Sequence, residues 1–152
     1  MLHRFALSLT RNETESLDLT QQTFYLWATR GGQLRDKSKL KSWLCTTLYR
    51  EFLRDQRHSQ RFPQVDISVV ESELPPVESE TIGRMDAALV MEALLEVDEI
   101  HRAPLMLFYT ENRSYQEIAG ILGVAVGTVM SRLARGKQQL RRQMSAKASH
   151  AT

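Results

Sequence analysis

Apolar residues between positions 40 and 52 recur at intervals of three or four, which places them on one face of a helix of at least four turns. An earlier helix is predicted from about Glu13 to Thr29, marked by Leu17, Phe24 and Ala28 and ended by a pair of glycines. The later helix has an apolar face of Leu40, Trp43, Leu44, Thr47, Leu48 and Phe52, and an opposite basic face of Lys39, Lys41, Arg50, Arg54 and Arg57.

The pattern changes between about residues 61 and 82, where three prolines and five acidic residues replace the helical spacing. Such a composition is typical of a linker. Beyond it, apolar residues from Leu89 to Val97 predict an amphipathic helix, and Asp98 is placed to cap another helix from about Glu99 to Thr110. Because no segment alternates apolar and polar residues as strands do, the sequence predicts an all-α protein, with two small helical domains joined by a flexible acidic linker.

The most informative motif lies between residues 114 and 133. Ser114 and Glu117 have the spacing of a capping box, in which the serine hydroxyl accepts from a free amide and the glutamate reaches back. Gly123 then allows a tight turn, since glycine adopts positive φ without strain. Ala119 is small enough for two helices to cross closely, and Val129 anchors the second helix. This order predicts a helix-turn-helix whose second helix enters the major groove of DNA.

The second helix of this motif, expected from about Gly127 to Met144, carries no acidic residue. In such a helix the early side chains face base edges and the later ones face phosphates. A solvated helix with a basic C-terminal end is the alternative, because the helix dipole favours cations there. The capping box and the glycine turn in register favour DNA binding. The exposed positions are Thr128, Ser131, Arg132, Arg135, Lys137, Gln138, Arg141 and Arg142.

The net charge of +2 conceals a strong segregation of charge along the 152 residues. Residues 1–62 carry a net charge of +5 and residues 126–152 a net charge of +6, whereas residues 63–83 and 84–125 carry −5 and −4. Two basic blocks separated by an acidic middle predict two contacts with nucleic acid, joined by a segment that nucleic acid repels.

Other features of the composition exclude several classes of protein. A hydrophobic fraction of 42% is enough for packed cores, so the chain is not wholly disordered. No apolar stretch has the length of a membrane span and no signal peptide is evident, so we expect a cytoplasmic protein without membrane insertion. Cys45 is the only cysteine, which excludes an internal disulfide and a zinc site with several thiolates. We expect it to be an apolar filler, and we expect no metal, cofactor or catalytic residue.

The segments HRAPLMLFY, SYQEIA and LGVAVGTVMSRL between residues 101 and 133 resemble region 4 of the extracytoplasmic-function sigma factors, which belong to the sigma-70 family of bacterial RNA polymerase initiation factors. DLTQQTF at residues 18–24 and LKSWL at residues 40–44 resemble region 2 of the same family. We therefore expect a region 2-like domain over residues 1–62, the linker over 63–84, a region 4-like helix-turn-helix domain over 85–145 and a disordered tail over 146–152.

The resemblance implies a division of labour between the two domains. Region 2 would dock on the clamp of the largest polymerase subunit and capture the melted strand of the promoter's −10 element, while region 4 would read the −35 element and hold the polymerase flap. An anti-sigma factor is a further expected partner. The implied polymerase-binding residues are Asp18, Leu19, Gln21 and Gln22. The implied −10 residues are Arg35, Lys37, Lys39, Tyr49, Arg50, Arg54 and Arg57. The implied −35 residues are Thr128, Met130, Ser131, Arg132, Arg135, Lys137, Gln138 and Arg141.

Capture of single-stranded DNA needs basic groups for the phosphates and an aromatic platform for an unstacked base. The first 62 residues hold eight of the eleven aromatic residues of the chain. We expect Phe24, Trp43 and Phe52 to lie in the core, and Tyr49, which is off the apolar face, to contact a base. In the second helix of the motif, Met130 stands where the family usually has a basic residue.

Two other functions remain open from the residues alone. A stand-alone helix-turn-helix repressor or activator would bind DNA without polymerase, but no dimerisation helix is evident and the Asp18 motif would be unexplained. A recombinase or nuclease would need a nucleophile or a carboxylate metal cluster, but Asp18, Asp36 and Asp55 are scattered and the four histidines lack companions. The sequence favours a polymerase-dependent initiation factor that binds promoter DNA.

Overall fold

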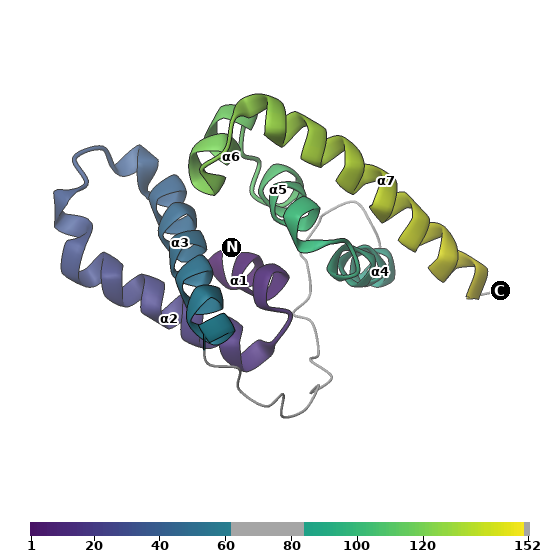
Figure 1. Cartoon of the computed structure of the whole chain (residues 1–152), viewed down its shortest axis with the longest axis horizontal. Helices are drawn as coiled ribbons and strands as arrows, with labels where there is room; N and C mark the ends of the chain where they lie inside the picture. The colour runs from purple at the N-terminus through teal and green to yellow at the C-terminus, as the bar shows by residue number, and fades with distance from the viewer. Residues whose placement is uncertain (62–83, 151–152) are drawn as a thin grey trace.

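The structure, a computed structural model, describes residues 1–61 and 84–150. Every regular element in these two ranges is a helix, which confirms the all-α class. The linker predicted over residues 63–84 lies outside the described residues except for Arg84, which begins a helix. The α-helices are α1 (Leu2–Thr10), α2 (Glu13–Arg30), α3 (Leu40–Arg61), α4 (Arg84–Leu95), α5 (Glu99–Tyr109), α6 (Tyr115–Leu122) and α7 (Val126–His150), and two 3-10 helices, η1 (Gly31–Gln33) and η2 (Lys37–Lys39), join α2 to α3 (Figure 1).

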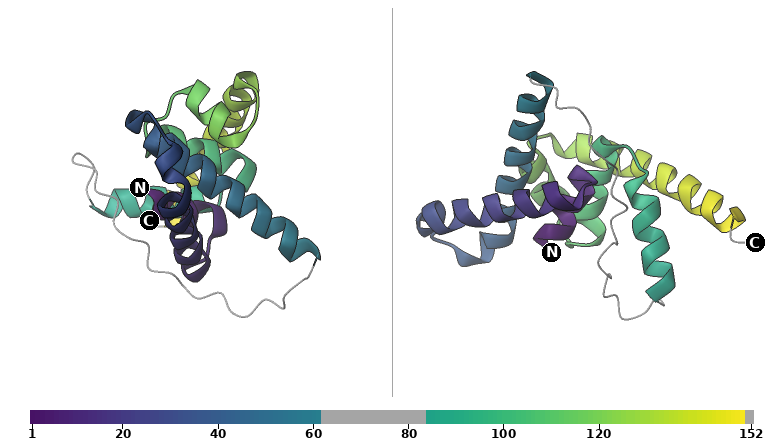
Figure 2. Two further views of the ribbon diagram at one scale, coloured as in Figure 1. Left: turned by 90° about the vertical axis from the view of Figure 1, so that its left-hand side faces the viewer. Right: turned by 90° about the horizontal axis from the view of Figure 1, so that it is seen from below.

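Helix α1 lies at the centre of the molecule, against α2 and α3 on one side and α5 on the other (Figures 1 and 2). Because neighbours cover both sides, Leu2, Phe5 and Leu9 are all buried and the helix has almost no solvated face. It ends at Arg11, whose φ of 55° is left-handed and whose amide donates to the carbonyl of Leu7. A reversal of the chain follows immediately, and α1 and α2 pack as a pair.

The periodic pattern predicted for α3 is confirmed by its burial. Leu44, Leu48 and Phe52 are buried, and Leu48 is completely inaccessible to solvent. The five basic residues predicted for the opposite face are all exposed. Helix α3 therefore presents one side to the core and a cationic side to solvent, as an amphipathic helix must.

Helix α2 buries a different face from the one that its large apolar residues predict. Leu17 and Phe24 are 48% and 49% exposed, so the expectation that Phe24 lies in the core is wrong. The buried residues of α2 are instead Ser16, Leu19 and Thr23. The hydroxyls of Ser16 and Thr23 donate to carbonyls of their own helix at 2.8 Å, which satisfies them without water and makes these small residues suitable for the core.

Two glycines fix the geometry of the C-terminal helices. Gly123 ends α6 with a φ of 67°, and its amide donates to the carbonyl of Ala119, as predicted for the turn. At Gly136 of α7 an added Cβ would lie 2.8 Å from Cδ1 of Leu105 and 3.1 Å from the carbonyl oxygen of His101. The absence of a side chain at Gly136 therefore sets the close crossing of α5 and α7.

The N-terminal and C-terminal halves pack against each other and share one continuous hydrophobic core. Arg102 of α5 lies in this seam with only 3% of its surface exposed. Its Nη1 donates to the carbonyls of Val97 at 2.7 Å and Leu95 at 3.2 Å, and its Nε donates to the carbonyl of Ser8 in α1. Burial lowers the pKa of the Arg102 guanidinium to about 10, which still leaves it charged at neutral pH. A buried cation bound by backbone carbonyls therefore joins the two halves.

The C-terminal end of the chain is more ordered than predicted. Helix α7 continues to His150, so the disordered tail expected from residue 146 is wrong for residues 146–150. Nζ of Lys147 lies 3.3 Å from carboxylate oxygens of both Glu92 and Glu96 in α4. These ion pairs attach the last turns of α7 to α4, a tertiary contact that the periodicity of the tail alone does not reveal.

Candidate nucleic-acid interface

Helices α6 and α7 form the predicted helix-turn-helix. The capping box is present: the hydroxyl of Ser114 accepts from the amide of Glu117 at 3.2 Å, and the amide of Ser114 donates to the Glu117 carboxylate at 2.8 Å. Val129 is fully buried, which confirms it as the anchor of α7. Because the first turn of each helix is fixed in this way, the N-terminal part of α7 is held at a defined position in front of α6.

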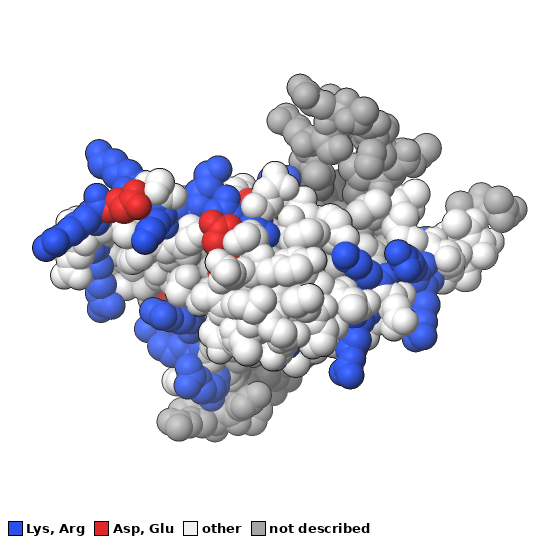
Figure 3. All heavy atoms as spheres, turned by 90° about the horizontal axis from the view of Figure 1, so that it is seen from above, with Lys and Arg blue, Asp and Glu red and all other residues white. Residues whose placement is uncertain are grey.

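The predicted −35 residues of α7 are mostly accessible. Helix α7 contains no acidic residue, and within the described part of the chain neither Arg132 nor Arg135 forms an ion pair. Figure 3 shows Lys and Arg gathered over α7 on a face with few Asp or Glu. Met130, Ser131, Arg135, Gln138 and Arg141 are exposed, and Thr128 and Arg132 are half-buried.

Lys137 differs from its neighbours on α7. Its Nζ lies 5.6 Å from the ring centroid of Phe108 and 5.7 Å from that of Tyr109, a cation–π arrangement. Tyr115 packs on Phe108 with the ring centroids 5.4 Å apart. This aromatic cluster on α5 and α6 was not identified from the sequence. It directs Lys137 toward its own domain rather than toward the face that carries Arg135.

Three of the predicted −10 residues lie in the connection between α2 and α3. Arg35, Lys37 and Lys39 are all exposed. The Asp36 carboxylate accepts from the amide of Ser38 at 3.0 Å and from its hydroxyl at 2.6 Å, and these bonds lower the pKa of Asp36. Asp36 thus caps η2 and shapes the connection. The basic side chains of the connection are exposed to solvent (Figure 3).

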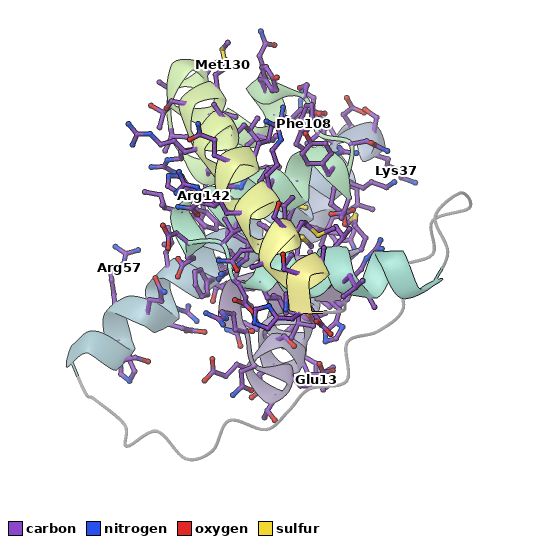
Figure 4. All side chains as sticks on the ribbon, turned by 90° about the vertical axis from the view of Figure 1, so that its right-hand side faces the viewer. Glu13, Lys37, Arg57, Phe108, Met130 and Arg142 are labelled. Carbon is purple, nitrogen blue, oxygen red and sulfur yellow. The ribbon has the colours of Figure 1, made fainter. Side chains whose placement is uncertain are left out.

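The other predicted −10 residues, on α3, differ from one another in exposure and in ion pairing. Arg50 and Arg57 are exposed, and Figure 4 shows Arg57 far from Lys37. Nη2 of Arg54 lies 2.5 Å from the Glu51 carboxylate, so part of its charge is neutralised. Tyr49 is half-buried at the seam, where burial raises the pKa of its hydroxyl and the charge of Arg132 acts in the opposite direction. In this arrangement Tyr49 is not an open platform for a base.

The predicted polymerase-binding residues divide between surface and core. Asp18, Gln21 and Gln22 are exposed on α2, whereas Leu19 is only 4% exposed and packs in the core. Asp18 and Gln22 line a groove of about 520 Å³ between α2 and α3. The exposed apolar side chains of Leu17, Phe24 and Tyr25 lie on the same helix, although their apolar character predicts burial.

Three further features of the described residues concern metal ions, the cysteine and membranes. They contain no group of three or more histidine, cysteine, aspartate or glutamate residues placed to hold a metal ion. Cys45 is buried, and desolvation raises the pKa of its thiol to about 11. Among the same residues, no single helix is long and apolar enough to cross a membrane.

Comparison with known proteins places both halves in one family. Residues 1–62 match sigma-70 region 2, and residues 87–140 match sigma-70 region 4. The ECF RNA polymerase sigma factor SigL of Mycobacterium tuberculosis is 32% identical over 136 residues, which cover 88% of this chain and 76% of the relative. The chain belongs to the ECF RNA polymerase sigma factors. As a sigma factor it directs RNA polymerase to promoters, with region 4 supplying DNA contacts.

Two further comparisons agree with this assignment. The ECF sigma factor SigE of Mycolicibacterium smegmatis is 33% identical over 145 residues, which cover 92% of this chain and 56% of SigE. The structure also resembles that of the sigma factor RpoE from Bartonella quintana, solved in complex with the anti-sigma factor NepR. The TM-score is 0.76 at 28% identity, covering 95% of this chain and 89% of that chain.

Proposed function

We propose that this sigma factor reads the −35 element with the exposed face of α7, contacts the −10 strand with the basic side chains of α3 and its preceding loop, and docks on polymerase through α2. The observation that carries the proposal is the cationic face of α7, where Arg135 and Arg141 are exposed. Arg132 and Arg135 stand on a helix without acidic residues, fixed by the helix-turn-helix. No described acidic residue forms an ion pair with Arg132 or Arg135, and phosphates would supply a counter-charge for both.

The polymerase contact rests on the exposed side of α2. Leu17, Gln21 and Phe24 recur at helical spacing on that side, with Asp18 beside them. Large apolar side chains that are half exposed and bordered by polar groups are typical of protein interfaces. We infer that this surface meets the polymerase clamp, and that the chain acts in the bacterial cytoplasm without catalytic chemistry of its own.

The two promoter contacts require the halves of the molecule to separate. The elements are named for positions about 25 base pairs apart, and B-DNA of that length extends about 85 Å. In the structure α3 packs against α6, and the charge of Arg132 acts on Tyr49. The chain between Arg61 and Arg84 reaches about 75 Å when fully extended, so it allows the halves to move apart as separate domains.

An anti-sigma protein is a further proposed partner. The Bartonella quintana sigma factor was solved bound to one, and it superposes on both halves of this chain. We infer that the packed arrangement is the form that such a partner binds, because that structure resembles this one over 95% of the chain with a TM-score of 0.76.

Two pairs of substitutions test the division of labour. In the full chain, Arg132→Ala with Arg135→Ala is expected to weaken promoter binding by the reconstituted holoenzyme. It should also reduce the slope of log affinity against log salt by about 0.9 for each lost phosphate contact. Asp18→Lys with Gln21→Lys is expected to weaken binding to core polymerase, measured by fluorescence anisotropy.

Gln33→Lys is the matched control for the α2 substitutions, since it adds a positive charge at another exposed position of the same half. It is expected to leave polymerase binding unchanged. Arginine variants that bind promoter DNA as the wild type does would contradict the placement of α7. Equal effects of Gln33→Lys and the α2 pair would contradict the docking surface.

A further inference from the structure

Three apolar side chains interrupt the polar surface of α7. Val126 and Met130 are 38% and 53% exposed, and Ala134 is exposed as well. Their spacing of four residues places them in one stripe along the helix. Figure 4 shows Met130 near the N-terminal end of α7, projecting away from the rest of the molecule. We call these three residues the apolar stripe.

Single exposed apolar residues are common on proteins and need no explanation. The stripe differs in its surroundings. Ser131 and Arg135 adjoin it, Gln138 and Arg141 continue its line toward the C-terminus, and α7 contains no acidic residue. An apolar line bordered by cationic and uncharged polar groups, on a helix without acidic residues, complements a polyanion that also exposes apolar groups, and this favours duplex DNA over a protein partner.

We propose that the apolar stripe recognises thymine methyl groups in the −35 element. This inference rests on the proposed placement of α7 in the major groove. The C5-methyl of thymine is the apolar group that a base pair exposes there, and small or apolar side chains contact it. The apolar stripe therefore specifies thymine where an arginine would specify guanine.

The dimensions of the helix limit which thymines are read. Residues four apart on a helix are separated by about 6 Å along its axis. Successive bases on one strand are about 3.4 Å apart. Val126 and Met130 therefore span about two base steps. Met130 is more exposed than Val126 and has the longest side chain of the three, so it is the main specificity-determining residue of the apolar stripe.

The test replaces thymine by deoxyuridine, which removes only the methyl group. A −35 sequence is first selected from a randomised promoter library with the holoenzyme of the full chain. Each thymine is then exchanged singly. Loss of one buried methyl contact is expected to weaken promoter binding about fourfold at one or two adjacent positions. Met130→Ala should bind the deoxyuridine and thymine promoters equally at the position that Met130 reads.

Ile100→Ala is the matched control, because Ile100 is 52% exposed on a different helix. This variant should keep the wild-type response to deoxyuridine. The inference is overturned if no selected thymine is sensitive to the exchange, if the selected element contains no thymine on either strand, or if Met130→Ala retains the full sensitivity. In those cases a continued loss of binding by the Arg132 and Arg135 variants would leave the proposed function intact, whereas no loss would remove the DNA site itself.

Discussion

At the scale of single residues, the functional helices depend on a few satisfied polar groups. Ser114 and Glu117 exchange two hydrogen bonds at the start of α6. The bond from the Ser114 amide lowers the pKa of the Glu117 carboxyl from its ordinary value of 4.5. This motif was predictable from the sequence, because a capping box needs only residues three positions apart. The burial of Arg102 was not, since its partner Ser8 lies in a distant helix.

A pH-dependent contribution to stability follows from Glu117. The pKa of the Glu117 carboxyl is lower in the folded chain than in the unfolded chain. The ionised carboxylate therefore stabilises the fold fully above the unfolded pKa, and this stabilisation is lost as the pH falls through the folded pKa. Ser114→Ala is expected to lower the free energy of unfolding by about 1 kcal/mol at pH 7. Glu117→Gln keeps an acceptor for the Ser114 amide but does not titrate. Between pH 5 and pH 3, the free energy of unfolding measured by chemical denaturation should therefore fall less in this variant than in the wild type. Identical pH profiles would contradict the role of this carboxylate.

At the scale of elements, periodicity predicted the strongly amphipathic helices and failed where apolar residues face solvent. In α3 the apolar face and the buried face coincide. In α2 the large apolar residues are exposed, because Ser16 and Thr23 allow close packing against α1 and a partner is expected to cover Phe24. Gly136 lies three residues after Leu133 and seven after Val129, on the buried face of α7. This helical spacing is visible in the sequence and would have predicted that Gly136 faces the core.

The crossing of α5 and α7 provides a test at this scale. Gly136→Ala places a methyl group against Leu105 and is expected to cost about 1 to 3 kcal/mol of unfolding free energy. Gly120→Ala, in α6, is the matched control, since no atom lies within 4 Å of the added group. That variant is expected to gain about 0.5 to 1 kcal/mol from helix propensity. Equal effects in urea unfolding would contradict the close crossing.

At the scale of the whole molecule, the seam between the halves is the feature that the sequence did not reveal. Arg102, Gln56 and Glu99 join elements far apart in the chain; for example, Nε2 of Gln56 donates to the Glu99 carboxylate at 3.1 Å. Charge segregation predicts two separate DNA contacts, and the chain matches two sigma-70 units, region 2 over residues 1–62 and region 4 over residues 87–140. How those units pack on each other depends on side chains that no local pattern singles out.

Separation of the halves is measurable by spin labels at Ser59→Cys and Ser145→Cys, both exposed positions. Cys45 stays unlabelled because its thiol is buried with a pKa of about 11. The free chain should give a single distance, and the promoter-bound holoenzyme should give a distance tens of ångströms longer. An unchanged distance distribution would show that the packed arrangement is also the active one.

The most direct measurement of the central claim is transcription from defined templates by purified chain and core polymerase. Together they are expected to start transcription at one position downstream of a reproducible −35 and −10 pair, and neither component alone should do so. Specific starts that persist without the chain would contradict the account, as would a chain that protects DNA equally well without polymerase and never redirects its start site.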